Sequence, residues 1–217
     1  MPEIKALLKG YNSFFQKYFT HDTELYSKLS EVGQSPPTLV IACSDSRVDP
    51  SIITSSDPGD IFVVRNVANM VPPYDDSSSG LHGVSAAVEF AVKMVQVKHI
   101  VVLGHSQCAG INALLNSEHI PATDFISDWV KMGEPAKAKT IARIPEDQPE
   151  ARQQCCEKES ILHSLENLLT FPWIKKRVEG GELKLHGWYF ELRNGSLQQF
   201  NAEQGEFVAV DTDNNVA

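Results

Sequence analysis

Two segments of the sequence carry side chains that can bind a metal ion, and each segment comes directly after an apolar run. The run at 38–42 is followed by Cys43, and the run at 99–103 is followed by His105 and Cys108. Two thiolates and an imidazole are ligand types suited to zinc. A single histidine or cysteine near a strand end is more often a packing residue, but two such segments together favour one shared metal site.

Three protein ligands leave one position of a tetrahedral zinc ion open. Structural zinc sites normally use four protein ligands, and the nearby sequence offers no third cysteine or second histidine at a familiar spacing. An open position can hold water, whose pKa zinc lowers to about 7, so that hydroxide forms in neutral solution. The ligand set therefore favours a catalytic zinc site over a structural one.

Asp45 and Arg47 lie two and four residues beyond Cys43, within the segment CSDSR. An arginine can hold a carboxylate through two parallel hydrogen bonds and keep it ionised. An ionised Asp45 beside the metal can accept a hydrogen bond from bound hydroxide, or it can take the fourth ligand position itself. The first arrangement is active and the second is blocked. A purely structural alternative is a turn-capping Asp45 beside a solvated Arg47.

The pattern of apolar residues predicts an α/β fold with a mostly parallel central sheet. Short continuous apolar runs predict buried strands at 38–42, 61–64 and 99–103, and residues 80–96 have helical spacing between the second and third runs. Strand, helix and strand in this order form a parallel crossover unit. The carboxyl ends of parallel strands then bring the two polar segments to one edge of the sheet.

The rest of the chain predicts a helical arm and a terminal β region. Apolar residues at three- and four-residue spacing predict an N-terminal helical arm over 1–35, interrupted once. Several prolines break the stretch 117–154, which we expect to be irregular and to add little to the core, before a helix at 155–169. Residues 182–210 predict strands joined by an Asn194–Gly195 hairpin at the edge of the sheet.

Composition and charge limit the other possibilities. The 217 residues, of which 42% are hydrophobic, predict one domain over 1–217, with a flexible tail at 211–217. The net charge of −9, without a long run of Lys or Arg, argues against nucleic-acid and membrane partners. The N-terminus lacks the apolar core of a secretory signal, and no run approaches the roughly 20 residues that span a bilayer, so we expect a cytoplasmic protein.

Three ordered motifs resemble those of the β-class carbonic anhydrases: CSDSR at 43–47, RNVAN at 65–69 and GHSQCAG at 104–110. The similarity covers most of the chain, because three further segments fit the family in order: PGDIFVVRNVANMVPPYD at 58–75, AAVEFAV at 86–92 and HGWYFEL at 186–192. The resemblance implies the β-carbonic anhydrase fold and reversible hydration of carbon dioxide to bicarbonate and a proton, by attack of zinc-bound hydroxide.

The resemblance also assigns residues to roles in this reaction. It implies one Zn2+ per chain on the cysteines and histidine named above, with Asp45 and Arg47 as a catalytic dyad. Substrate-binding roles fall on five further positions, of which the first and last orient the oxygens and the others form an apolar surface: Gln34, Phe62, Val67, Phe90 and Ala109. Glycine is the commoner family residue at position 109, so the backbone amide there is expected to differ slightly.

Self-association and subgroup follow from the same resemblance. It implies a homodimer or a dimer of dimers, with active sites near the interface and the N-terminal arm crossing to the partner. One group of the family carries an allosteric bicarbonate pocket built from a Trp, an Arg and a Tyr. This chain has Val40 and Phe190 at the Trp and Tyr positions, and of the three residues only Arg65 remains. The chain is therefore more similar to the plant-type group, in which a Gln before the first strand, here Gln34, reaches the substrate.

Two other functions are consistent with the same residues. A carbonyl sulfide or carbon disulfide hydrolase would use the same zinc scaffold on a different linear molecule. A catalytically silent, zinc-binding regulatory protein would keep the metal ligands but would not need Asp45, Arg47 and Gln34.

Overall fold

A computed structural model of the protein describes residues 1–76, 82–116 and 125–211. The chain divides into two units, Met1–Ser35 and Pro36–Ala217.

The N-terminal unit is helical, as its apolar spacing predicts. It contains three helical segments, of which the second is a π-helix: α1 (Pro2–Phe15), η1 (Gln16–His21) and α2 (Glu24–Val32). The predicted interruption is confirmed, because α2 begins only after Thr23, although the Thr23 side chain makes no capping hydrogen bond. Aromatic rings close the turn, with Phe19 and Tyr26 centroids 4.9 Å apart. Within residues 1–35, all of which are described, no helical side chain is buried.

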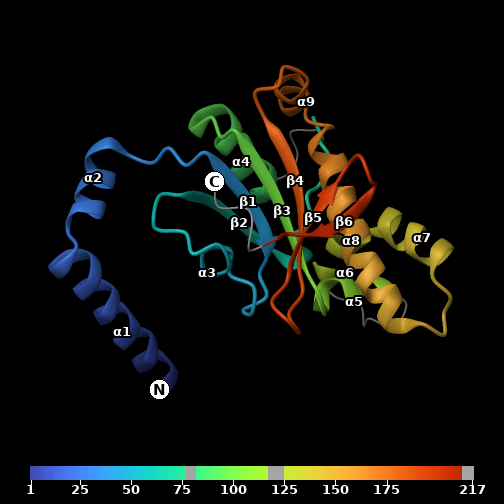
Figure 1. Ribbon diagram of the computed structural model, residues 1–217, viewed down its shortest axis with the longest axis horizontal. Helices are drawn as coiled ribbons and strands as arrows, with labels where there is room; N and C mark the ends of the chain where they lie inside the picture. Colours follow the sequence, from blue (N-terminus) through green and yellow to red (C-terminus); the bar gives the residue numbers. More distant parts are fainter. Residues whose placement is uncertain (77–81, 117–124, 212–217) are drawn as a thin grey trace. The chain divides into compact units, whose positions relative to one another are not determined.

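The second unit is built on a mixed sheet whose described strands follow the order β2-β1-β3-β4-β5-β6 (Figure 1). The first four strands in this order are mutually parallel. Strand β5 pairs antiparallel with β4, and β6 pairs antiparallel with β5. Their bounds are β1 (Thr38–Cys43), β2 (Ile61–Asn66), β3 (His99–His105), β4 (Lys184–Phe190), β5 (Leu197–Asn201) and β6 (Glu206–Ala209). The predicted α/β fold with a mostly parallel sheet is confirmed.

The central strands are apolar along their length because both of their faces are buried. Leu39 and Ile41 of β1 join the large core formed with the helices, whereas Val40 and Ala42 point to the opposite face. Successive side chains of a strand alternate between faces, so a strand that is covered on both sides reads as a continuous apolar run.

Helices complete the layers around the sheet. Helix α4 (Gly83–Glu89) continues as the π-helix η3 (Phe90–Val95) and, with α8 (Pro149–Leu168) and α9 (Pro172–Glu179), supplies the large core. Helix α8 packs against β3, β4, α5 and α7. The shorter elements are α3 (Pro50–Ile53), the 3-10 turn η2 (Val67–Asn69) and α5 (Ala109–Leu115).

The prediction that residues 117–154 are irregular and add little to the core is wrong for the part that the structure describes. This part contains α6 (Ile126–Lys131) and α7 (Glu134–Arg143), and α8 begins at Pro149 rather than near residue 155. Val130 of α6 is fully buried. Pro135 and Pro149 lie in the first turns of their helices, where proline starts a helix because no intrahelical donor is lost there.

The C-terminal hairpin is confirmed. Strands β4 and β5 pair antiparallel, and Gly195 between them has a φ of +71°, a conformation that favours glycine. The Gly195 N–H donates to the carbonyl of Glu191 at 2.9 Å. Residues 212–217 of the predicted tail lie outside the described residues.

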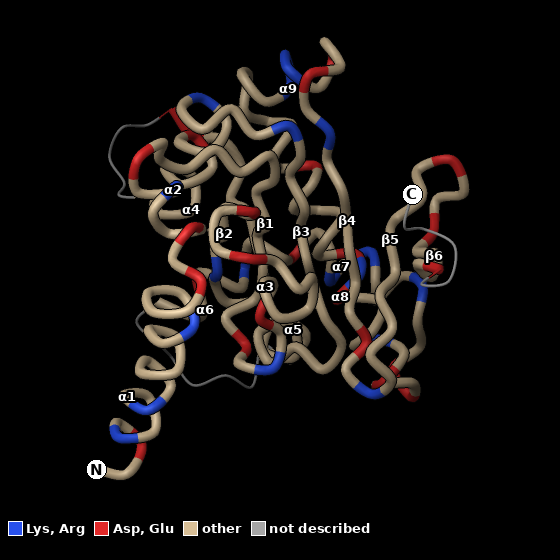
Figure 2. The backbone as a smooth tube through the Cα atoms, turned by 60° about the vertical axis from the view of Figure 1, so that its left-hand side comes forward, with Lys and Arg blue, Asp and Glu red and all other residues tan. Residues whose placement is uncertain are grey.

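The described part of the chain carries charges of both signs (Figure 2). Basic residues are interspersed with acidic ones along the backbone (Figure 2). Among the described helices, none has the length and apolar character needed to cross a membrane.

Close packing between β3 and α8 gives a test of the fold. A Cβ added at Gly104 would lie 2.7 Å from Ile161 Cδ1 and 2.8 Å from Ile161 Cγ1. We expect Gly104→Ala to lower the free energy of unfolding by about 1–3 kcal/mol through overpacking, and to cost less in an Ile161→Ala background. Chemical denaturation measures both. Gly83→Ala, where a Cβ meets nothing within 4 Å, is the matched control; equal effects at the two glycines would contradict this packing.

Candidate metal centre

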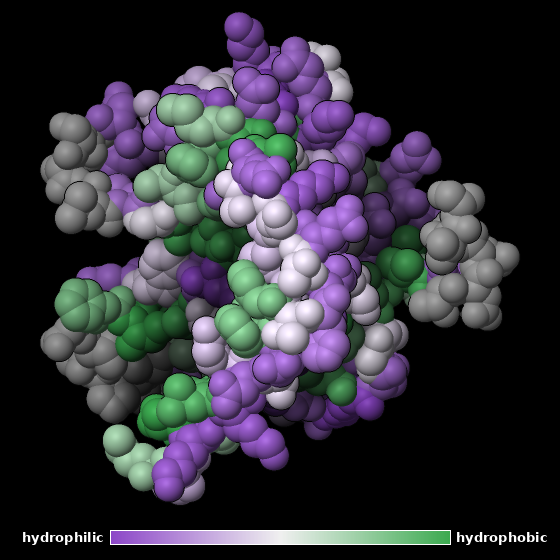
Figure 3. Space-filling model, turned by 90° about the vertical axis from the view of Figure 1, so that its left-hand side faces the viewer, coloured by the Kyte–Doolittle hydropathy of each residue, from purple (hydrophilic) through white to green (hydrophobic). Residues whose placement is uncertain are grey.

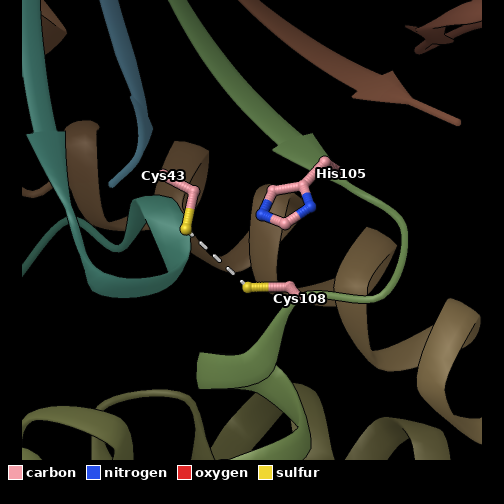
Figure 4. A group of neighbouring side chains, drawn as sticks. All are labelled: Cys43, His105 and Cys108. Carbon is pink, nitrogen blue, oxygen red and sulfur yellow. Dashed lines mark hydrogen bonds between the residues drawn. The ribbon is translucent and has the colours of Figure 1, made fainter. Parts of the chain in front are cut away.

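The carboxyl ends of two adjacent parallel strands place the predicted ligands side by side. Cys43 is the last residue of β1 and His105 is the last residue of β3, and these strands pair in parallel register. Cys108 follows after a tight turn as the N-cap of α5. The three side chains converge from these elements (Figure 4).

The ligand atoms of this trio lie within 4.8 Å of one another. The two sulfurs are 3.9 Å apart. The side chains come from residues that are only 5% exposed at Cys43 and 1% exposed at His105 and Cys108. The predicted convergence of the two segments is therefore confirmed, and it occurs in the interior of the protein.

The geometry of the trio fits a zinc ion. Two sulfurs bound at 2.3 Å and separated by a tetrahedral angle lie about 3.8 Å apart, close to the observed separation. His105 Nδ1 donates to the carbonyl of Ser106 at 2.8 Å, which leaves the lone pair on Nε2. Nε2 is buried without a hydrogen-bond partner among the described residues. A buried acceptor of this kind is costly unless a hydrogen-bond donor or a metal ion satisfies it.

The protein environment favours negative charge on one of the two sulfurs when no metal is bound. The hydrogen bond from the Cys108 thiol, opposed by burial, lowers the pKa of Cys43 to about 4. The same hydrogen bond, together with burial, raises the pKa of Cys108, so that the pair shares one proton when no metal is bound. Backbone N–H groups of Asp45 and Ala68 approach the Cys43 sulfur, and those of Gly110 and Ile111 approach the Cys108 sulfur.

Asp45 is held beside the trio by Arg47. Arg47 Nε donates to Asp45 Oδ1 at 2.9 Å, and Arg47 Nη2 donates to Oδ2 at 2.7 Å. The Arg47 guanidinium keeps the pKa of Asp45 far below its usual value, against the opposing effect of burial. Asp45 Oδ2 lies 4.0 Å from His105 Nε2. An ionised carboxylate therefore faces the metal site without belonging to the ligand trio.

Glu157 of α8 is a supporting residue that sequence reasoning missed. Its carboxylate is buried and accepts hydrogen bonds from the backbone N–H of Cys108 at 3.0 Å, from Gln153 at 2.7 Å and from the Tyr189 hydroxyl at 2.8 Å. Burial raises the pKa of Glu157, although these hydrogen bonds oppose the shift. In the sequence, Glu157 lies in a charged helical segment and looks like a solvated residue.

Two of the residues assigned to substrate lie at the metal end of the sheet. Val67 follows β2 directly, and Ala109 follows the ligand Cys108. The two segments approach so closely that a Cβ at Gly110 would lie 2.7 Å from Val67 Cγ1. Val67 also lines an apolar cavity of about 720 Å³ together with Trp129.

Phe62 and Phe90, which were also assigned to substrate, are not brought to this site within one chain. Phe62 pairs with Leu39 near the start of the strands, four residues before Asn66, which pairs with Cys43. That spacing corresponds to about 13 Å along β2. Phe90 stacks on Phe62, with ring centroids 5.9 Å apart. Gln34 belongs to the N-terminal unit, where it is exposed.

Known proteins share this sequence and fold. A family model described as carbonic anhydrase matches residues 38–197. Beta carbonic anhydrase 5, chloroplastic, from Arabidopsis thaliana is 42% identical over 192 residues, which are 88% of this chain and 62% of that protein. The chain thus spans less than two thirds of that relative's length.

Solved structures agree with the sequence comparisons. The β-carbonic anhydrase CcaA superimposes with a TM-score of 0.88 at 35% identity, over 98% of this chain and 94% of that chain. Tetrameric β-carbonic anhydrases from the filamentous ascomycete Sordaria macrospora give a TM-score of 0.80 at 26% identity, over 93% of this chain and 98% of that chain. With a family model that matches most of its length, the chain belongs to the β-class carbonic anhydrases.

Proposed function

We propose that this protein catalyses the zinc-dependent, reversible hydration of carbon dioxide to bicarbonate and a proton. The observation that carries the proposal is the buried trio of Cys43, His105 and Cys108 with an ionised carboxylate beside it. The trio holds the zinc, one ion per chain. When bound, the ion supplies a hydroxide nucleophile at neutral pH, because it lowers the pKa of a coordinated water to about 7.

The residues around the trio orient the reactants. Asp45 Oδ2 accepts the hydrogen bond of the nucleophile and directs its lone pair toward the substrate. Arg47 holds both carboxylate oxygens, so Asp45 stays ionised and would be kept from binding the metal itself. Val67 gives the uncharged substrate an apolar approach, and the backbone at Ala109 orients its oxygens.

Hydrolysis of carbonyl sulfide or carbon disulfide is the alternative activity for the same arrangement. Both molecules are linear and would meet the same nucleophile, so only a direct comparison of turnover on carbon dioxide and carbonyl sulfide separates the activities. A silent regulatory protein is disfavoured by the Asp45–Arg47 pair, since a purely structural metal site has no use for a carboxylate held beside it.

A second copy of the chain is part of the proposal. Phe62 and Phe90 stack at the opposite end of β2 from Cys43, so a contact of these rings with substrate would be made at the site of a partner. Large apolar side chains are exposed nearby, among them Phe90 at 47% and Met94 at 70%. Apolar patches interrupt the polar surface of one face of the molecule (Figure 3). Self-association would cover them.

The arm, the subgroup and the location extend the proposal. The exposed apolar side chains of α1, such as Leu7 at 70% exposure, suit a helix that docks on a partner subunit, where Gln34 would meet the partner's substrate. Val40 and Phe190, in place of the Trp and Tyr of an allosteric bicarbonate pocket, support membership of the plant-type group. A single domain over 1–217 and a cytoplasmic location stay predictions; the Arabidopsis relative is named chloroplastic.

Replacement of Asp45 tests the function. We expect Asp45→Asn to lower kcat for CO2 hydration by about a hundredfold or more, because the amide can no longer act as a charged acceptor, while zinc content stays unchanged. Asp147→Asn, on an exposed residue, is the control. Stopped-flow measurement of the proton released gives the rates. A zinc-loaded wild type that is inert from about pH 6.5 to pH 9 would sink the proposal.

The pH dependence gives a second test of the Asp45–Arg47 pair. The guanidinium lowers the pKa of Asp45, so the carboxylate is charged above that depressed value and is protonated only as the pH falls through it. We therefore expect no titration of Asp45 between about pH 5 and pH 9. Carbon-13 NMR of labelled aspartate, compared between wild type and Asp45→Asn, detects any titration in that range, which would contradict the assignment.

Mixing two variants tests the shared site. Asp45→Ala disables the chemistry of its own chain but keeps Phe62, whereas Phe62→Ala does the reverse. If Phe62 serves the partner's site, dissociation and reassociation of the two variants together restores activity above the sum of the separate samples. Activity equal to that sum would show that each chain is self-sufficient. Mixing Asp45→Ala with Arg47→Ala is the control, since both lesions then lie in the same site.

Metal removal should expose the ligand sulfurs to alkylation. In the zinc-loaded protein we expect iodoacetamide to modify Cys155, which is half-buried, before the other thiols. Chelation frees the Cys43 and Cys108 sulfurs, and their labelling then rises. Cys156 serves as an internal control, because burial raises its pKa to about 12. Mass spectrometry of the peptides reads the result, and labelling of Cys43 that is indifferent to zinc would contradict the ligand assignment.

A further inference from the structure

Arg65 of β2 contacts the loop that carries Cys43 and Asp45 through three separate donors. Its Nε donates to the carbonyl of Cys43 at 3.0 Å, and its Nη2 donates to the carbonyl of Asp45 at 2.6 Å. Its Nη1 donates to Asp49 Oδ2 at 2.9 Å. The Arg65 side chain is 28% exposed, so these bonds are partly shielded from water.

These contacts fix the loop at both of its ends. The Cys43 carbonyl marks the point where β1 ends, and the Asp49 side chain caps α3 by accepting from the backbone N–H of Ser51 at 3.0 Å. Between them, the Asp45 carbonyl also accepts from the Val48 N–H at 3.2 Å, which closes a turn. One guanidinium therefore ties the metal ligand, the dyad carboxylate and the start of the next helix to the neighbouring strand.

We propose that Arg65 is a positioning residue for the metal centre, which sets where the Cys43 sulfur and the Asp45 carboxylate stand relative to His105 and Cys108. The inference deepens the proposed function and rests on its zinc site. Arg65 touches neither the ligand sulfur nor the Asp45 carboxylate in the contacts above; it binds the backbone of both residues. Its planar fork serves several acceptors at once, whereas a lysine presents one ammonium on a flexible stem.

Arg177 provides a matched control elsewhere in the same unit. Its guanidinium also binds backbone carbonyls, with Nη1 donating to Val92 at 2.9 Å and Nη2 donating to Val97 at 3.1 Å. The Val92 carbonyl lies within η3 and the Val97 carbonyl lies before β3, at the opposite end of that strand from His105. Arg65→Lys and Arg177→Lys therefore remove the same kind of fork, one beside the metal loop and one remote from it.

The experiment compares these two variants as full chains loaded with Co2+ in place of zinc. We expect Arg65→Lys to change the visible absorption spectrum of the Co2+ site, to speed metal transfer to a chelator by about tenfold or more, and to lower kcat/KM by a similar factor. Arg177→Lys should lower the melting temperature while it leaves the spectrum and the transfer rate within about twofold of wild type. An unchanged spectrum and transfer rate in Arg65→Lys would overturn the proposal.

A milder variant separates positioning from a simple ion pair and covers the case in which Arg65→Lys does not fold. Asp49→Asn keeps an oxygen for the helix cap but removes the charge opposite Arg65. If the two carbonyl contacts position the centre, Asp49→Asn keeps the Co2+ spectrum and transfer rate within about twofold of wild type. If Asp49→Asn instead gives the altered spectrum expected of Arg65→Lys, the ion pair is responsible and the proposal fails. Loss of zinc binding or activity in the wild type would refute the proposed function itself.

Discussion

The metal centre depends on three buried atoms that can bind a cation together. The sulfurs of Cys43 and Cys108 and the Nε2 of His105 meet in the interior, and the nitrogen has no other partner among the described residues. Buried lone pairs and thiolates are unfavourable unless hydrogen bonds or a cation offset the loss of water. Because the unfolded chain does not present these atoms together, metal binding and folding of this region stabilise each other.

The fold brings these three atoms together with few residues between the strands and the ligands. Strands β1 and β3 are adjacent and parallel, so their carboxyl ends lie side by side and Cys43 and His105 need no long loop to meet. Helix α5 begins at the third ligand, and its first N–H groups favour negative charge on the Cys108 sulfur. Glu157 then fixes the backbone of Cys108 from α8, as Arg65 fixes that of Cys43 from β2.

The part of this arrangement that is local in the sequence could be predicted, and the part that depends on packing could not. Ligand types directly after apolar runs predict the strands and the metal trio together. The segment that contains α6 and α7 was predicted to be irregular because of its prolines. A proline in the first turn of a helix cannot be told in the sequence from one that breaks a helix. Glu157 was missed because a buried acid whose partners are distant in sequence cannot be told from a solvated one.

Strand β2 lies at one edge of the sheet and links two regions that the family resemblance predicts to form one apolar surface. Its carboxyl end carries Arg65 beside the metal loop, and its amino end carries Phe62 stacked on Phe90 at a half-exposed surface. A rigid strand fixes the distance between those ends, so any partner that rests on the rings is also fixed relative to the metal loop. Assembly and catalysis would then share one element, since a shift of β2 would displace the Cys43 loop of its own chain and the apolar surface offered to the partner.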